Sequence, residues 1–378
     1  AAEGGASSTA AGAGAGAGAR APLRAVVPAL VDMLRADDPA VRQAGAHALG
    51  ALGRDETVAI RLVDSGAVCA LDALRNGRGV KRGGVADAAA AGAAAEALRH
   101  LARHHAPTSL WLLRAVPAHL RTREGFYALA PGMPFLTGAQ VAALGRAAEG
   151  EAAREVITAS PASDADLRAL VSRAHAELQG ADDGASAARA LAELVSAQLG
   201  GAISYDRYED FSCAAAVLSA KLSAGSDAIA LTRLTRGGAW HRALLFKVLV
   251  DHADARISAS LELGWRVRGA HAGLAWNEVM VVGARAHARA RASQGAQVAR
   301  RLANCLRATR PAPLPVGRCA GKPFVVDLLH DVGSLYPLDS PQADRCVRRA
   351  RARARRDNPP QKLRHGSGCT QVAWAHAQ

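Results

Sequence analysis

A cysteine and two histidines could supply thiol chemistry in this chain: Cys213, His241 and His271. The thiolate is the nucleophile in such chemistry, and an imidazole must lower the pKa of the thiol and later carry the proton. An active thiol protease or transglutaminase would therefore need Cys213 to lie within hydrogen-bond reach of His241 or His271. The sequence alone leaves that convergence open.

The residues around His241 follow an order that is typical of thiol hydrolases. Residues 237–247 place two glycines before a helix, residues 274–277 (Leu-Ala-Trp-Asn) fall on a later strand, and Asp327 falls on a third. This layout is similar to that of papain-like and transglutaminase-like domains, which carry a Cys at the helix start and a His before Ala-Trp. Ala239 and Leu274 occupy those two positions here, so Asp327 has no imidazole to orient. We interpret all three positions as vestigial and assign no catalytic residue.

The same segment resembles the peptidase-like domain of the armadillo repeat-containing protein 3 family, which plant Raf-like kinases of the constitutive-triple-response and enhanced-disease-resistance type share. The resemblance rests on residues 241–247, on 275–279, and on 326–340. Plant members often keep a Cys at the position of Ala239, so its absence favours a binding or scaffolding domain. No His-Arg-Asp or Asp-Phe-Gly kinase signature is present. The resemblance also implies a cytoplasmic setting, in motile cilia or flagella.

Several residues have structural interpretations that outweigh catalytic ones. His241 is expected to tie the helix start to a neighbouring strand, and Cys213 to pack in the core as a small hydrophobe. A shift of three residues along a strand would place His271 about 10 Å from the vacant His position. Trp276 and Asn277 are expected to seal and hydrogen-bond the former site.

Two basic residues of the same helix, Arg242 and Lys247, are the remaining interaction candidates. Together with the amino terminus of the helix they could form an anion-binding corner. The favoured interpretation is an ion pair with Asp327 or Glu278.

The amino-terminal third contains an internal repeat. Residues 29–32 recur as 70–73, an offset of 41 residues from Leu30 to Leu71, and each copy leads into an Ala-rich helix. This period is typical of HEAT or armadillo units, which usually need about three copies to bury a continuous core. Only two units and part of a third fit before about residue 120, so we expect a fragment whose earlier repeats are missing. An unrelated Ala-rich helical bundle is the alternative.

Composition argues against several other classes. Of 47 basic residues 42 are Arg, a skew that resembles the coding bias of a GC-rich genome and weakens any nucleic-acid argument from the net charge of +14. Seven arginines lie within residues 345–356 without interleaved aromatic rings, as expected for a solvated tail. The six cysteines form no Cys-x-x-Cys pair, so neither a metal site nor a cofactor is expected, and the chain is assigned to a reducing compartment. No strongly apolar run reaches the length of a membrane span.

The predicted fold class is multi-domain: an all-α armadillo-type solenoid fragment followed by an α+β papain/transglutaminase-like domain. The expected segments are a low-complexity leader (1–20), armadillo-like repeats (21–122), a connecting region that serves as hinge or cap (123–163), the peptidase-like domain (164–345) with a flexible insertion (284–321), and a basic disordered tail (346–378). Within the second domain we predict helices from about 165, at 185–199 and at 240–252, and strands at 229–231, 257–263, 276–282 and 324–328.

The favoured function is a non-catalytic scaffold that binds protein partners through the armadillo groove and the peptidase-like domain. Two alternatives are kept: an active thiol protease or transglutaminase-like enzyme that uses Cys213, and an Arg-rich nucleic-acid-binding protein. Membrane partners are not expected.

Overall fold

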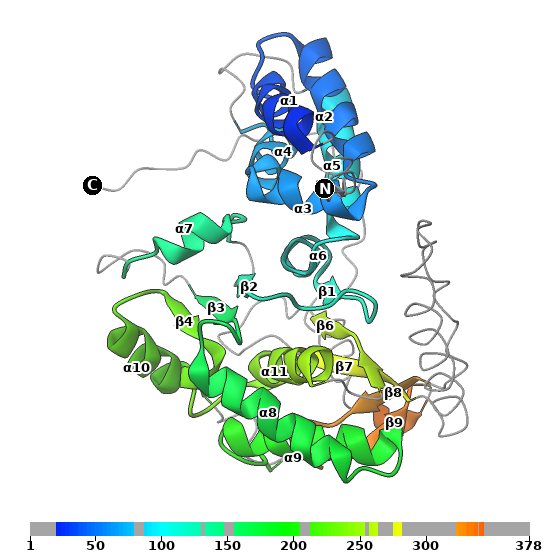
Figure 1. The fold of residues 1–378 in the computed structure, drawn as a ribbon, viewed down its shortest axis with the longest axis vertical. Helices are drawn as coiled ribbons and strands as arrows, with labels where there is room; N and C mark the ends of the chain where they lie inside the picture. Colours follow the sequence, from blue (N-terminus) through cyan, green and yellow to red (C-terminus); the bar gives the residue numbers. More distant parts are fainter. Residues whose placement is uncertain are drawn as a thin grey trace, which may run out of the picture.

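The computed structural model describes residues 20–78, 87–129, 133–146, 155–204, 212–253, 257–263, 275–281, 323–338 and 340–343. A helical half stacks on a half that mixes helices and strands (Figure 1). The helical half contains α1 (Arg20–Met33), α2 (Pro39–Leu52), α3 (Glu56–Asp64), α4 (Ala67–Arg75), α5 (Ala88–Ala102) and α6 (Ala106–Leu113). The predicted leader, insertion and basic tail lie outside the described residues, apart from the last residue of the leader.

Small residues let the helices of the first half approach closely. The repeated Ala-Leu pairs lie on α1 and α4, and each of these helices packs against the Ala-rich helix that follows. A Cβ added to Gly50 of α2 would lie 3.3 Å from the Cα of Ala97 on α5, so glycine permits this contact. α2 begins after an N-cap aspartate, because the Asp38 carboxylate accepts the N–H of Ala40 at 2.8 Å.

The second half combines helices with short strands. Its elements are β1 (Ala115–Val116), β2 (Phe126–Leu129), α7 (Gly138–Ala142), β3 (Val156–Ala159), α8 (Ala165–Gln179), α9 (Gly184–Gln198), α10 (Ala214–Ala224), β4 (Ala228–Ala230), the 3₁₀ turn η2 (Leu231–Arg233), α11 (Ala239–His252), β5 (Ile257–Ala259), β6 (Leu261–Leu263), β7 (Ala275–Val281), β8 (Pro323–Val326) and β9 (Leu335–Pro337). The helices and strands predicted for this region are all found, within a few residues. β1, β2, β3, β9, α7 and α10 were not predicted.

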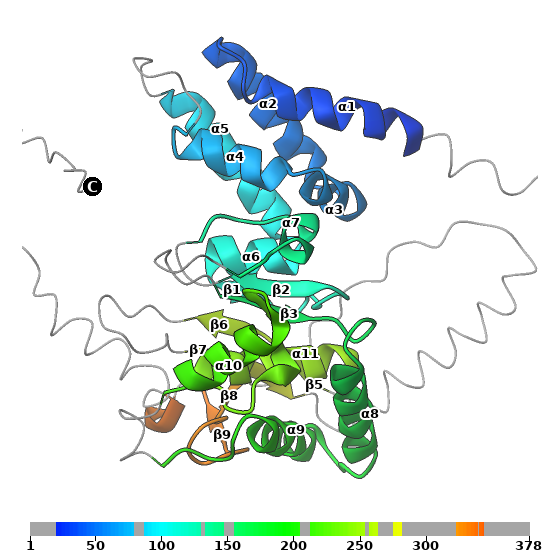
Figure 2. The same ribbon diagram turned by 90° about the vertical axis from the view of Figure 1, so that its left-hand side faces the viewer.

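The larger sheet is antiparallel, with the order β1-β6-β7-β8-β9, and β5 also pairs with β7. β5 and β6 hold the same register on β7: Ile257 pairs with Val281, and Glu262 with Trp276. Between them Ser260 donates its N–H to the carbonyl of Glu278 at 2.9 Å. The predicted strand 257–263 is therefore one strand interrupted at Ser260. Helices α9 and α11 pack on this sheet, with α8 beside them (Figure 2).

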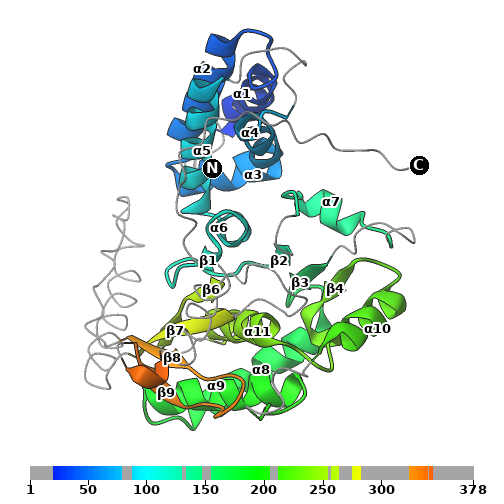
Figure 3. The same cartoon turned by 180° about the vertical axis from the view of Figure 1, so that it is seen from behind.

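The smaller sheet joins the two halves. β2 runs antiparallel to β3, and β3 runs parallel to β4, beside which α10 packs (Figure 3). Because successive side chains of a strand point to opposite faces, Phe126 and Ala128 enter the core of the second half, whereas Tyr127 and Leu129 enter the core of the helical half. Residues 123–163, expected to be a hinge or cap, therefore contribute an internal layer that is apolar on both faces.

Glu262 makes the stability of the larger sheet dependent on pH. Burial, and then the nearby Glu278 carboxylate, raise the pKa of Glu262 from 4.5 to about 7. A raised carboxyl pKa means that the folded state binds the proton more tightly, so this contribution to stability is lost as pH rises from about 4.5 to about 7. Glu262→Gln is expected to raise the free energy of unfolding at pH 8 by about 1 kcal/mol, after allowance for solvent screening, and to leave it nearly unchanged at pH 4.5.

Urea denaturation of the full chain at both pH values measures this effect. Glu124→Gln removes the same charge at an exposed position and should change neither value by more than about 0.5 kcal/mol. An equal effect of Glu262→Gln at the two pH values would contradict the prediction.

Candidate functional site

The start of α11 is fixed by local contacts. Gly238 is the N-cap in extended conformation, and its N–H donates to Nδ1 of His241 at 3.2 Å. A Cβ on Gly237 would lie 3.0 Å from the Leu199 side chain, so this position has no room for a larger residue. Ala239 follows in the first turn and is 3% exposed.

Of the other two positions interpreted as vestigial, Asp327 lies in the described part of the chain. Asp327 follows β8, and its carboxylate accepts the N–H groups of Leu329, His330 and Asp331 at 2.8, 2.9 and 3.2 Å. Leu274 lies outside the described residues, as does His271. The carboxylate of Asp327 therefore holds its own turn.

Arg242 is fully buried and binds backbone, in contrast to the predicted ion pair. Its Nε donates to the Gly237 carbonyl at 2.9 Å, Nη1 to Leu328 at 2.9 Å, and Nη2 to Leu199 and Gly201 at 2.9 and 2.7 Å. A fifth bond runs from Nη1 to the Ser196 hydroxyl at 3.3 Å. Burial lowers the pKa of Arg242 to about 10, against an opposing effect of the nearby Asp327 carboxylate. The guanidinium joins the end of α9, the start of α11 and the turn after β8.

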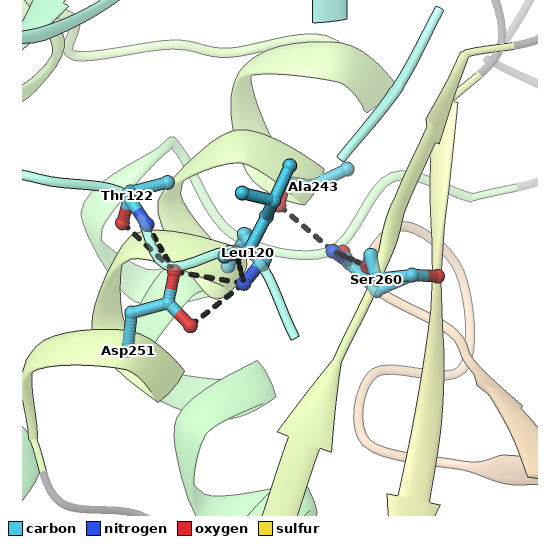
Figure 4. Close-up of polar contacts among 7 residues, drawn as sticks. Leu120, Thr122, Ala243, Asp251 and Ser260 are labelled. Atoms are coloured by element: carbon cyan, nitrogen blue, oxygen red, sulfur yellow. Dashed lines mark hydrogen bonds and ion pairs between the residues drawn. The ribbon is translucent and has the colours of Figure 1, made fainter. Parts of the chain in front are cut away.

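Lys247 pairs with Asp251, one turn further along α11, and not with Asp327 or Glu278 as predicted (Figure 4). Its Nζ lies 2.7 and 2.8 Å from the two carboxylate oxygens and donates to the Leu120 carbonyl at 2.8 Å. Asp251 also accepts the N–H and hydroxyl of Thr122, at 2.7 and 2.9 Å. This buried cluster fastens the segment after β1 to α11.

Asn277 links α11 to the larger sheet. Its Nδ2 donates to the carbonyls of Ala243, at 3.0 Å, and of Ser260, at 2.8 Å (Figure 4). It therefore forms hydrogen bonds in this region, as expected. Trp276 lies in β7, and its side chain is outside the described part of the chain.

A second set of side chains meets beside the start of α11. His241, 1% exposed, places Nε2 3.2 Å from Oε1 of Glu155, the residue before β3. The expected tie between the helix start and a neighbouring strand is thus present. Cys213 is the N-cap of α10 and is half-buried, so the expectation that it packs in the core was wrong. His241 acts electrostatically on this thiol and lowers its pKa.

Electrostatics shift the pKa values of Cys213 and His241 in opposite directions. The hydrogen bond with His241 is the main cause that lowers the pKa of the Cys213 thiol. Burial alone would lower the pKa of His241, but the hydrogen bonds with Cys213 and Glu155 outweigh burial and raise it. Glu155 was missed at the sequence level, because a single acidic residue before a short strand gives no signal of its distant partners.

Within the described ranges, no group of three His, Cys, Asp or Glu side chains is arranged to hold a metal ion. Among the helices in those ranges, none has both the length and the apolar character needed to cross a bilayer.

The comparisons with known proteins agree with this α+β domain. Residues 103–264 match the family model described as EDR1/CTR1/ARMC3, peptidase-like. Human armadillo repeat-containing protein 3 is 32% identical over 154 residues, which are 41% of this chain and 14% of the human protein. The resemblance to this family is therefore confirmed. The family match begins upstream of the predicted boundary at residue 164 and includes β1, β2 and β3. It ends at residue 264, so it contains residues 241–247 but not 275–279 or 326–340. No solved structure matches this chain.

Proposed function

We propose that this protein is a non-catalytic scaffold that binds protein partners. The start of α11 is the observation that carries the proposal. Buried Ala239 occupies the position of the nucleophile, and the Asp327 carboxylate is engaged by three backbone N–H groups of its own turn. Arg242 uses its N–H donors on carbonyls and a hydroxyl, so this basic group is engaged in holding the fold.

The helical half supplies the surface that we assign to a partner. α1 with α2, and α4 with α5, form two helix pairs that we interpret as armadillo-type units, and α2 packs along α5. A shallow hollow lies between α2 and α5, with His47 and Arg54 on one side and Glu96 and His100 on the other. The two imidazoles, the Arg54 guanidinium and the Glu96 carboxylate can form hydrogen bonds with an extended peptide. The name of the human relative favours a protein partner, and the resemblance favours the cytoplasm of cilia or flagella.

The test compares variants of the tagged full chain in extracts of ciliated cells. The double variant His47→Glu, Arg54→Glu should capture at least about tenfold less partner than the unsubstituted chain, because two basic contacts become acidic. Arg99→Glu, a charge reversal at an exposed position of α5 outside the hollow, should retain it. Identical capture by both variants would refute the role of the hollow.

The purified full chain should also show no turnover of casein, or of paired glutamine and lysine peptides, above the blank. Turnover would refute the non-catalytic part of the proposal. Nucleic-acid binding through residues 345–378 stays a prediction, because those residues lie outside the described part. Steep salt dependence of binding, lost on deletion of 345–378, would support it.

A further inference from the structure

Residues 133–137, which precede α7, form neither helix nor strand and are held by side chains of three other elements. Three groups donate to backbone carbonyls of this segment: Trp111 of α6 at 3.0 Å, Cys69 of α4 at 3.2 Å, and the hydroxyl of Tyr127 on β2. The acceptors are the carbonyls of Met133, Phe135 and Leu136, in that order. Every residue type carries a backbone carbonyl, so these bonds hold a chain in place without selecting its side chains.

Phe135 supplies the contact that does depend on the side chain. Among residues 133–137 only Phe135 is buried, with 3% exposure. Its ring centroid lies 5.5 Å from that of Trp111, 5.9 Å from that of Tyr127 and 6.5 Å from that of His105. Aromatic pairs at these distances attract each other in edge-on and tilted arrangements. The surface therefore selects an aromatic side chain at one position of the segment.

The donors are supported by contacts that do not involve residues 133–137. The Arg75 guanidinium lies 5.5 Å from the centre of the Trp111 ring and is itself held by the Asp72 carboxylate at 2.6 Å. Tyr127 lies in β2, and the pairing of β2 with β3 fixes its backbone. These supports stay in place when another chain replaces the segment, so the surface is organised before binding.

The groups that face the segment are uncharged. Burial raises the pKa values of the Cys69 thiol and of the Tyr127 hydroxyl, so both groups keep their protons at neutral pH and can donate. Burial also lowers the pKa of His105 to about 4, so its ring is neutral. Such a surface favours a neutral segment with an aromatic residue over an acidic or phosphorylated one.

We propose that the surface formed by Cys69, Trp111 and Tyr127 is a peptide-binding site that residues 133–137 occupy in the free protein. The partner is a segment of a second protein in which phenylalanine follows proline, as in residues 134–135. A helical segment does not fit, because its carbonyls bond to its own N–H groups. Proline restricts the preceding residue to extended backbone, which lowers the entropic cost of binding.

The tethered segment and the partner segment exclude each other, so the contact seen in the free protein is autoinhibitory. Four of the five tethered residues are exposed or partly exposed, so a second chain can approach them from solvent. The residues of this site do not line the hollow between α2 and α5, so the test of this site is independent of the test of the hollow.

The probe is a fluorescein-labelled peptide with the sequence of residues 133–137, and its affinity for the full chain is measured by fluorescence anisotropy. The unsubstituted chain should bind it weakly, because the tethered segment competes at an effective concentration on the order of millimolar. Phe135→Ala removes the aromatic anchor from the tethered segment only, and this chain should bind the peptide at least about tenfold more tightly. Equal affinities of the two chains would overturn the proposal.

Val141→Ala is the matched control, because Val141 is buried in the same core but lies on α7, outside the segment. It should leave peptide binding at the level of the unsubstituted chain. Binding as tight as that of Phe135→Ala would indicate general loosening and would refute the site. Trp111→Phe, added to Phe135→Ala, should weaken peptide binding severalfold, since the donor to the first carbonyl is lost. Unchanged binding would place the peptide elsewhere.

Salt separates this site from a charged one. Peptide binding should be nearly constant between about 0.05 and 0.5 M salt, and a steep decrease would contradict recognition by uncharged groups. Circular dichroism checks the fold of each variant. If Phe135→Ala unfolds, the unsubstituted chain decides the question: about millimolar peptide with a photoreactive benzophenone in place of the phenylalanine ring should crosslink to α6 or β2. Crosslinks only to other elements, or none, would overturn the proposal.

Discussion

Arg242→Met is expected to lower the free energy of unfolding by at least about 4 kcal/mol, a large part of the stability of a domain. The substitution deletes every guanidinium donor in a site with 0% exposure. The carbonyls of Gly201, Gly237 and Leu328 would lose this partner, whereas that of Leu199 would keep the N–H of Gly237. A buried acceptor without a partner costs about 1–3 kcal/mol, and a domain is stable by only about 5–15 kcal/mol.

Urea unfolding of the full chain, followed by circular dichroism, measures this loss. Arg242→Lys should recover little of it, because an ammonium has three donors and lacks the planar fork that reaches these acceptors. Arg233→Met, at an exposed position in η2, should stay within about 0.5 kcal/mol of the unsubstituted chain. A loss below about 1 kcal/mol for Arg242→Met would show that the guanidinium bonds do not hold the fold.

Lys247→Met is expected to cost about 3–5 kcal/mol, because it leaves the Asp251 carboxylate buried without its cation. The lysine is 0% and the carboxylate 6% exposed. Arg173 and Glu177 provide a matched pair, since they have the same spacing on α8 but are 62% and 51% exposed. Arg173→Met should cost less than about 1 kcal/mol, because solvent screens that pair.

Combining Lys247→Met with Asp251→Asn should recover part of the loss, because the neutral amide no longer buries an unpaired charge and can still accept the Thr122 N–H. Hydrogen exchange at the Thr122 amide provides a local measurement. Lys247→Met should accelerate it, since Asp251 then holds the segment after β1 less rigidly. Equal costs for Lys247→Met and Arg173→Met would show that burial does not strengthen the pair.

Local signals in the sequence predicted α8, α9 and α11 and the strands β4 to β8. Asp38 and Asp164 each cap the helix that follows with a carboxylate, at α2 and α8. The alternation of residues 257–263 predicted a strand that holds one register on β7. Capping and periodicity act between residues a few positions apart, so the sequence displays them directly. The Lys247–Asp251 pair had such a signal, an i,i+4 spacing on a helix, and it was overlooked.

The partners of buried polar groups were decided by tertiary packing. Any buried cation needs acceptors, but Arg242 takes carbonyls, which every residue carries, so its sequence surroundings could not identify them. β2 and β3 form an internal layer because both of their faces are apolar, and each face packs into a different hydrophobic core.

The sequence by itself determined several helix starts and the strand periodicity. The contact between His241 and Glu155 was decided only by the tertiary structure, since the two residues are 86 positions apart and approach through the parallel pairing of β3 with β4. Local preferences act over one or two turns of chain, whereas contacts between distant residues depend on how the completed elements pack.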